Sequence, residues 1–300
     1  MEFRQLEIFR VLADELNFTR TAERVHCVQS NVTVQIRALE TELGVALFER
    51  LGKQVRLTEH GRRLVQYAER VLGLLEEAKV AVSVGEEPRG LLRIGVPESV
   101  LTYRLPLVLQ ALRERYPAIE LNFSAESCAK LWNLLVRGGV DLVLTISDFP
   151  HQARLHVETL CKEPMVLLAH PGNPLSTRDD VALRDLQTET MLLTEEDCSY
   201  RNKLEQLLAR GGVQPAATLT FTSVEAIKQC AALGIGIAYL PRITAEAELA
   251  SGRLAALRWT GPRLEMHTLA AWHKDKWQSP AMIAFLKLLD ERFPREAVSR

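Results

Sequence analysis

Apolar residues recur at helical spacing in the first part of the chain and predict three short helices. The first helix ends near Asn17, and its apolar positions are Leu6, Phe9, Leu12 and Leu16. A second helix is expected over 20–25, capped by Thr19 and followed by a brief break at His26 and Cys27. One face of the third helix is apolar and should be buried; its residues are Val32, Ile36, Leu39 and Leu43. This order of helix, tight turn and helix is typical of a helix-turn-helix.

The opposite face of the third helix carries side chains that suit the edges of bases in a major groove. Gln pairs with adenine, Arg with guanine and Ser or Thr with either, while Val can contact the thymine methyl group. The candidates are Gln29, Ser30, Asn31, Thr33, Val34 and Arg37. For an isolated helix a merely solvated face is the alternative, so the interpretation depends on the residues that come after the helix.

A basic hairpin is predicted directly after this helix. Apolar residues at 45–48 are followed by two short extended arms around a turn at Gly52. The whole chain has a net charge of -1, but residues 50–63 hold Arg50, Lys53, Arg56, Arg62 and Arg63 against one acid, Glu59. We expect a wing in which Arg50, Lys53 and Arg56 hold DNA phosphates, because such contacts set affinity and salt dependence without reading sequence.

A long helix comes next, with apolar residues spaced alternately four and three apart. They are Leu64, Ala68, Val71, Leu75, Ala78 and Val82. This spacing is that of a coiled-coil seam, so we expect residues 61–87 to form a linker that pairs two copies of the chain. Pairing would place two recognition helices on successive major grooves, roughly 34 Å apart. Packing of the seam against the rest of its own chain is the alternative.

Beyond a hinge at 85–90, strand-like and helix-like segments alternate as in a parallel α/β sheet. The alternation restarts at Met165, and a final helix at 281–292 is expected to return to the first half, with crossovers near Lys162 and Met266. We therefore expect two α/β lobes, one formed by 88–162 and 267–300 and the other by 163–266. The cleft between the lobes is the expected pocket for a small-molecule effector.

Polar residues follow several predicted strands, where ligands bind in sheets of this kind. The candidates are Ser99, Thr102, Ser127, Ser147, Cys198, Ser199 and Ser223. Each has an alternative interpretation as an ordinary helix cap or turn residue, so only their convergence on one pocket would be informative.

The N-terminal motifs resemble the DNA-binding signature of LysR-type transcriptional regulators. The matching stretches are TAERV at 21–25, QSNVT at 29–33, IRALE at 36–40, LG at 43–44, LFER at 47–50 and LTEHG at 57–61. Two positions depart from the family pattern. The family often has Ser or Thr where this chain has Val28, and a polar or basic residue where it has Val34, which affects helix capping and an operator contact.

The resemblance implies an α+β multidomain fold. An N-terminal winged helix-turn-helix at 1–60 and a linker helix would precede a two-lobed α/β effector-binding domain at 88–300, similar to periplasmic binding proteins. It also implies sequence-specific binding to promoter DNA, control by an effector held between the lobes, RNA polymerase as a partner, and homodimers or homotetramers. Family effectors contact polar residues after the first and second strands, which implies roles for Ser99 and Ser127.

Cys198 is a candidate redox sensor, because it lies at a predicted helix start where amide dipoles can lower a thiol pKa. Three acidic neighbours at 195–197 oppose a thiolate, and the following dozen or so residues hold no second cysteine to act as a resolving partner. The peroxide-sensing branch of the family uses such a pair. An ordinary cap residue is the favoured interpretation.

Other functional classes receive little support from the sequence. The seven histidines form no H-E-x-x-H motif and the five cysteines no C-x-x-C pair, so we expect no metal, no cofactor and no enzymatic activity. An exported solute-binding protein would suit the two lobes, but it would need a signal peptide and would have no use for residues 1–60. The N-terminus shows no long apolar run, so a cytoplasmic location without membrane insertion is expected.

Overall fold

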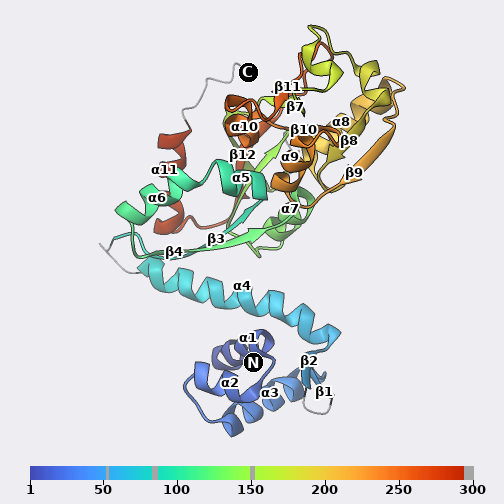
Figure 1. Ribbon diagram of the computed structural model, residues 1–300. Coiled ribbons are helices and arrows are strands. Elements are labelled where there is room, and N and C mark those ends of the chain that lie inside the picture. The colour runs from blue at the N-terminus through green and yellow to red at the C-terminus, as the bar shows by residue number, and fades with distance from the viewer. Residues whose placement is uncertain (52–53, 83–86, 149–152, 294–300) are drawn as a thin grey trace. The chain divides into compact units, whose positions relative to one another are not determined.

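The computed structural model describes residues 1–51, 54–82, 87–148 and 153–293, which form two compact units, Met1–Glu86 and Glu87–Arg300. In the first unit three helices precede a two-stranded antiparallel sheet and a long helix (Figure 1). The elements are α1 (Phe3–Glu15), α2 (Phe18–Arg24), α3 (Gln29–Leu43), β1 (Phe48–Leu51), β2 (Gln54–Leu57) and α4 (Glu59–Val82). The predicted helix-turn-helix and hairpin are therefore confirmed.

The second helix begins earlier than predicted and has a different cap. Asn17 precedes α2, and its side-chain oxygen accepts hydrogen bonds from the amides of Thr19 and Arg20 at 2.9 and 3.1 Å. The prediction that Thr19 caps this helix was wrong, because Thr19 already lies inside α2. The turn to α3 is tight because His26 adopts the left-handed conformation, with a φ of 53°.

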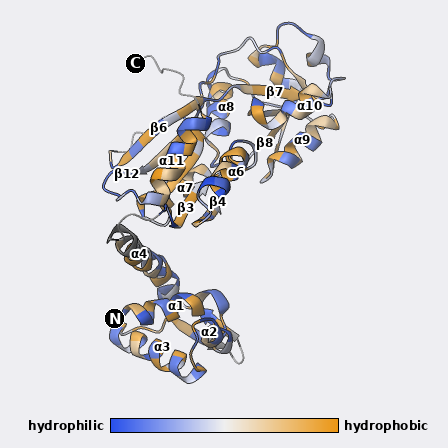
Figure 2. Ribbon diagram, turned by 90° about the vertical axis from the view of Figure 1, so that its left-hand side faces the viewer, coloured by the Kyte–Doolittle hydropathy of each residue, from blue (hydrophilic) through white to orange (hydrophobic). Residues whose placement is uncertain are grey.

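The apolar face of α3 is buried as expected at three of its four predicted positions. Val32, Ile36 and Leu39 lie in the core of the first unit, whereas Leu43 is 38% exposed and was wrongly assigned to this face. Leu43 is the last helical residue, and Gly44 beyond it adopts a φ of 69° that ends the helix. Figure 2 shows hydrophobic and hydrophilic residues interleaved along α1 and α3, as expected of amphipathic helices.

The first half of the predicted coiled-coil seam packs within its own unit. Ala68 is fully buried and Leu64 and Val71 pack against the same core, which α1 and α4 build together. At these positions the seam packs against its own chain, which was the alternative to pairing with a second copy. Leu75 is half-buried and Ala78 is exposed, while the side chain of Val82 lies outside the described residues.

The second unit contains two five-stranded sheets, which define lobe I and lobe II. Lobe I has the strand order β4-β3-β5-β12-β6, in which β3 runs parallel to β4 and β5 while β12 is antiparallel to its neighbours. Its strands are β3 (Gly90–Val96), β4 (Ile119–Ala125), β5 (Leu142–Ser147), β6 (Leu155–Lys162) and β12 (His267–His273). The strand at β6 was not predicted.

Lobe II has the strand order β11-β7-β10-β8-β9. Its strands are β7 (Met165–Ala169), β8 (Thr190–Leu193), β9 (Ala217–Thr220), β10 (Ile237–Pro241) and β11 (Ala255–Ala256). Strand β10 is parallel to β8 and antiparallel to β7.

Helices cover these sheets. In lobe I they are α5 (Glu98–Tyr103), α6 (Pro106–Arg115), α7 (Cys128–Val136) and α11 (Pro280–Arg292); α6 and α11 pack together and α7 packs on β3, β5 and β12 (Figure 1). In lobe II they are α8 (Ser199–Arg210), α9 (Val224–Ala232) and α10 (Glu246–Ala250), with short 3₁₀ helices at Pro174–Thr177, Leu183–Thr188 and Arg242–Ala245.

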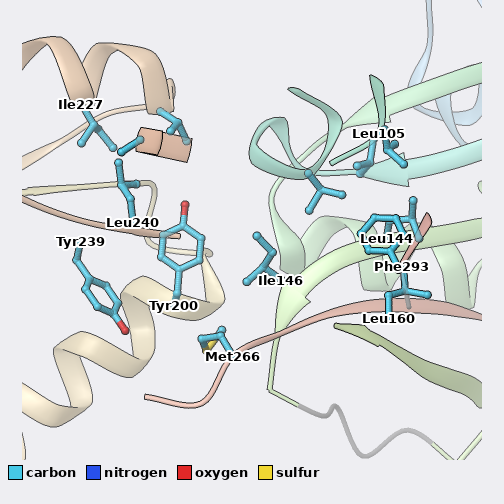
Figure 3. Packing of buried hydrophobic residues seen from close by; sticks show 14 of the residues in the cluster. Leu105, Leu144, Ile146, Leu160, Tyr200, Ile227, Tyr239, Leu240, Met266 and Phe293 are labelled. Atoms are coloured by element: carbon cyan, nitrogen blue, oxygen red, sulfur yellow. The ribbon is translucent and has the colours of Figure 1, made fainter. Parts of the chain in front are cut away.

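The chain passes between the lobes twice, and the two passages lie side by side. The Glu163 amide, just after β6, donates a 2.8 Å hydrogen bond to the Met266 carbonyl, just before β12. Buried side chains continue from one lobe to the other at this point: Figure 3 shows Ile146 and Met266 between the lobe I core and the aromatic residue Tyr200 of lobe II. The two crossovers expected from the sequence are thus present.

Candidate functional site

The outward face of α3 presents most of the residues proposed to read DNA bases. Gln29, Ser30, Asn31 and Arg37 are exposed, and Val34 is 60% exposed. Thr33 is half-buried, and its hydroxyl donates a 3.2 Å hydrogen bond to the Gln29 carbonyl. The helix therefore offers an outward surface of polar groups that also includes the apolar side chain of Val34. Before it, Val28 has no polar atom with which to cap α3.

The hairpin is attached to the C-terminal part of α3 by the side-chain carboxylate of Glu40. The Glu40 side chain accepts hydrogen bonds from the amides of Leu47 and Phe48, at 2.7 and 3.2 Å. The ring of Phe48 packs on Phe9 with their centroids 5.5 Å apart. Because Glu40 belongs to α3, the orientation of the hairpin is coupled to that of the helix.

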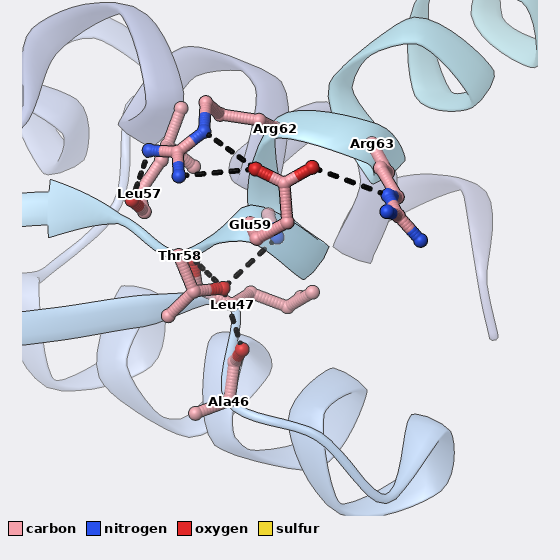
Figure 4. A network of polar contacts seen from close by, with 8 residues as sticks. Ala46, Leu47, Leu57, Thr58, Glu59, Arg62 and Arg63 are labelled. Atoms are coloured by element: carbon pink, nitrogen blue, oxygen red, sulfur yellow. Dashed lines mark hydrogen bonds and ion pairs between the residues drawn. The ribbon is translucent and has the colours of Figure 1, made fainter.

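Thr58 attaches α4 to the same junction (Figure 4). Its hydroxyl donates to the carbonyls of Ala46 and Leu47, at 2.8 and 3.2 Å, and accepts a 3.0 Å hydrogen bond from the Gly61 amide in the first turn of α4. Gly61 packs so closely on Leu47 that a Cβ there would lie 2.2 Å from the Leu47 carbonyl oxygen. The Thr-Glu-His-Gly sequence thus connects the hairpin to the long helix.

The basic residues near the hairpin lie in different settings. Arg56 is exposed on β2 opposite Glu49, the backbone of Arg50 pairs with Val55, and Lys53 lies outside the described residues. Arg62 and Arg63 both form ion pairs with Glu59, and these arginines lower the Glu59 pKa through hydrogen bonds and charge. The local excess of positive charge is therefore partly neutralised.

A cavity of 440 Å³ lies between lobe I and lobe II. Lobe I contributes the beginnings of α5 and α7, and lobe II contributes the segments that lead into α8 and α9. The lining includes Glu98, Ser99, Glu126, Ser127, Cys128 and Lys130 from lobe I and Glu195, Cys198, Tyr200, Phe221, Thr222 and Ser223 from lobe II. Four predicted effector residues thus converge here, namely Ser99, Ser127, Cys198 and Ser223.

Three hydrogen bonds connect the two lobes at this cavity. The Glu98 carboxylate of lobe I accepts a 2.9 Å hydrogen bond from the Val224 amide, at the first turn of α9, and a 3.3 Å hydrogen bond from the Ser223 hydroxyl. The Ser127 hydroxyl donates to the Asp197 carboxylate across the cavity, at 3.3 Å. These contacts bring the N-terminal ends of helices from both lobes to one place.

Comparison with known proteins assigns both units. Residues 3–62 match the family described as "Bacterial regulatory helix-turn-helix protein, lysR family", and residues 85–294 match "LysR substrate binding domain". The chain belongs to the LysR family of transcriptional regulators. Its fold class is accordingly a helix-turn-helix followed by an α/β substrate-binding domain, as predicted.

Several LysR-family proteins are similar to this chain over almost their whole length. The HTH-type transcriptional regulator YwqM of Bacillus subtilis is 40% identical, over 98% of this chain and 100% of that protein. A full-length OxyR variant from Pseudomonas aeruginosa has a TM-score of 0.74 at 24% identity, covering 99% and 96% of the two chains. Full-length CbnR bound to its target DNA has a TM-score of 0.72 at 23% identity, covering 97% and 100%. These two structures share the fold of the LysR-type chain.

Three predicted effector residues lie elsewhere in this LysR-type protein. Among the described residues that line the cavity, Thr102, Ser147 and Ser199 are absent. Thr102 is exposed within α5, which begins at Glu98. Ser147 is buried and donates to the Asp148 carbonyl at 2.7 Å, and Ser199 follows the cap position within α8. These three residues therefore do not line this cavity.

Cys198 lies in the cavity but does not have the lowered pKa that a helix start suggests. Burial, with a smaller contribution from the charge of the nearby Cys128 thiol, raises the pKa of Cys198 to about 11. Burial also raises the pKa of Tyr200 well above its ordinary value. Desolvation therefore raises the pKa of the Cys198 thiol by more than the dipole of α8 can lower it. Cys128, a cysteine distant in sequence, lines the same cavity.

A second cavity of 470 Å³ adjoins the two passages between the lobes and was not predicted. Its lining combines aromatic and aliphatic side chains such as Tyr239, Trp259 and Leu207 with charged ones such as Arg263 and Glu265. The described part of the chain holds no group of three or more His, Cys, Asp or Glu suited to a metal ion. None of its helices combines the length and the apolar character needed to cross a bilayer.

Proposed function

We propose that this LysR-type regulator reads promoter DNA with the outward face of α3 and responds to a small molecule bound in the 440 Å³ cavity. The observation that carries the proposal is the exposed row of Gln29, Ser30, Val34 and Arg37, beside a hairpin that Glu40 fixes to the same helix. Arg, Gln and Ser supply the hydrogen bonds that distinguish bases, while the basic residues of the sequence at Arg50, Lys53 and Arg56 supply phosphate contacts.

Footprinting of the purified full-length chain on the DNA upstream of its own and neighbouring genes tests this proposal. We expect protection of a segment with two half-sites, and Arg37→Ala should remove the preference for this segment over random DNA. Arg10→Ala on α1, which replaces an arginine that pairs with Asp14, is the matched control and should leave the preference intact. Equal affinity of the unaltered protein for random DNA would contradict the proposal.

We also propose that two or four copies assemble through α4, but through a surface different from the predicted seam. Leu64, Ala68 and Val71 are used within the first unit, whereas Tyr67 and Leu74 are 61% and 63% exposed. Tyr67 and Leu74 are seven residues apart, so they lie on one side of the helix. An apolar side of this kind suits a second copy of the same helix.

The remaining features of the proposal follow from membership of this family. The protein acts in the cytoplasm, where its DNA is, and changes transcription through RNA polymerase. It needs no cofactor or metal and catalyses no reaction. Thermal-shift titration with metabolites tests the effector site: a stabilising ligand should lose its effect when Ser127 is changed to Trp, which fills the cavity. Unchanged stabilisation would place the effector elsewhere.

A further inference from the structure

The charges that line the cavity between the lobes are predominantly negative. In the described part of the chain, its charged lining residues are Glu98, Glu126 and Glu195 against one cation, Lys130. Lys130 forms a 3.1 Å ion pair with Glu126, and Glu126, followed by Glu195 and Asp197, raises the pKa of Lys130. The single ammonium of the lining is therefore neutralised by its own neighbours.

The position in this cavity that would best bind an anion is already filled. Amides at the N-terminus of a helix attract negative groups, and α9 directs its first amide into the cavity. Glu98 occupies that position through its contacts with Val224 and Ser223. A carboxylate or phosphate on a ligand would have to displace Glu98 there, and it would then stand beside a displaced carboxylate of like charge.

We propose that the effector carries a protonated amine, which binds to Glu98 from lobe I and Glu195 from lobe II. This inference rests on the proposed function of the cavity and specifies the chemistry of its ligand. The Glu98 carboxylate keeps lone pairs beyond the two hydrogen bonds it accepts, so an ammonium can bind without breaking them. Tyr200 and Phe221 in the same lining offer aromatic surface to the cation and its carbon chain.

The amine would also connect ligand binding to the closure of the cavity. Glu98 and Glu195 line the cavity from different lobes. Carboxylates of like charge oppose each other's approach, whereas a cation bound between them would attract both. The ligand would therefore favour the conformation in which the lobes approach, by the difference in its affinity for the two conformations.

Three molecules with the same five-carbon chain and different end groups test the charge preference. Cadaverine is a dication, δ-aminovalerate a zwitterion and glutarate a dianion. In thermal-shift titrations of the full-length protein at low salt, we expect the two amines to raise the melting temperature and glutarate to have no effect. Stabilisation by glutarate alone would overturn the proposal.

Two neighbouring carboxylates supply a matched pair of variants. Glu195 lines the cavity, whereas the adjacent Glu196 is exposed and is not among the described lining residues. Glu195→Gln should weaken amine binding roughly tenfold, as expected for the loss of one close charge pair, and Glu196→Gln should not. Glu98→Gln, which retains an acceptor for the Val224 amide, should weaken it similarly. Equal effects of Glu195→Gln and Glu196→Gln would show that the amine binds outside this cavity, for example in the second one.

A measurement that needs no ligand decides the case in which none of the three molecules binds. Thr222 is exposed at the cavity and adjoins Ser223, so Thr222→Cys places a reporter thiol beside Glu98. Peptide mass spectrometry then follows its reaction with a cationic trimethylammonium and an anionic sulfonate methanethiosulfonate reagent. Relative to free cysteine, the cationic reagent should react roughly tenfold faster, and Glu98→Gln should reduce this preference.

No preference for the cationic reagent, or a preference for the anionic one, would overturn the inference. Footprinting on DNA does not depend on the charge of the cavity. The proposed regulatory function can therefore fail or hold independently of this result.

Discussion

Gly61 of α4 lies directly against the Leu47 carbonyl, and an added Cβ would stand 2.2 Å from its oxygen. Real side chains do not approach a backbone atom this closely, so only glycine allows α4 to begin where Thr58 attaches it. The contact explains why a glycine follows the Leu-Thr-Glu-His sequence at the end of the hairpin. It also makes the junction between hairpin and long helix sensitive to a single methyl group.

Gly61→Ala is expected to destabilise the first unit by roughly 1–3 kcal/mol, as overpacking does in well-packed regions. The effect should appear in the full-length chain as faster hydrogen exchange of α4 and the hairpin, together with weaker DNA binding. Gln66→Ala, at an exposed position of the same helix, is the control and should change stability by less than about 0.5 kcal/mol. Equal exchange in both variants would show that the junction shifts to accommodate a Cβ.

Glu163→Gln should strongly destabilise the second unit. The Glu163 carboxylate is fully buried and accepts hydrogen bonds from the Arg104 guanidinium at 2.8 and 3.0 Å and from the Thr268 hydroxyl at 2.7 Å. Removing its charge leaves the Arg104 guanidinium without its counter-charge, and breaking a buried ion pair typically costs about 3–5 kcal/mol. Urea denaturation should show a lower midpoint for this variant, while Glu265→Gln, at an exposed position nearby, should behave as the unaltered protein.

The thiol of Cys198 should react slowly with alkylating reagents at neutral pH. Only the thiolate is nucleophilic, and burial raises the Cys198 pKa to about 11. Its rate of modification, followed by peptide mass spectrometry, should increase about tenfold per pH unit through roughly pH 8–10. A rate that levels off near pH 7 would instead support a reactive thiol and the redox-sensing alternative.

The same pKa shift affects stability at alkaline pH. In the unfolded chain the thiol ionises near its ordinary pKa of 9.0, whereas in the folded protein it stays protonated to about 11. The contribution of this group to folding stability is therefore complete below pH 9 and decreases as pH rises toward 11. Cys198→Ser should show a smaller loss of stability over this interval, measured by chemical denaturation at each pH.

Leu74→Glu should weaken self-association without unfolding the chain. Leu74 is 63% exposed, so a charge there costs little in the isolated chain but would be buried between two paired α4 helices. Sedimentation velocity should show a shift toward monomers. Gln66→Glu, which adds the same single charge at an exposed position away from Tyr67 and Leu74, is the comparison, and equal shifts in both variants would show that net charge rather than the apolar side of α4 is responsible.

Periodicity predicted the first unit well because its helices are amphipathic and its motifs are local. The outward face of α3 and the hairpin both follow from residues within one short stretch. The errors there are at helix ends: the Asn17 side chain competes successfully with Thr19 as the cap, and Leu43 becomes exposed because Gly44 turns the chain away. The exact ends of a helix depend on hydrogen bonds and backbone angles, which cannot be inferred from the spacing of apolar residues.

The cavity was harder to predict because it is assembled from distant parts of the chain. Polar residues after strands identified Ser99, Ser127, Cys198 and Ser223, since helices begin there. Glu98 was missed because an acidic residue in the first turn of a helix is ordinary, and only the structure shows that its carboxylate reaches α9 in the other lobe. The positions of Cys128 and Cys198 in the sequence likewise give no indication that both residues line one cavity.

The adjacent passages at Glu163 and Met266 restrict how the lobes can move. Two strands fastened side by side resist stretching and sliding, and they permit bending about a line through both. A ligand bound in the cavity would then change mainly one quantity, the angle between lobe I and lobe II. Ligands of different shape would then hold the lobes at different angles.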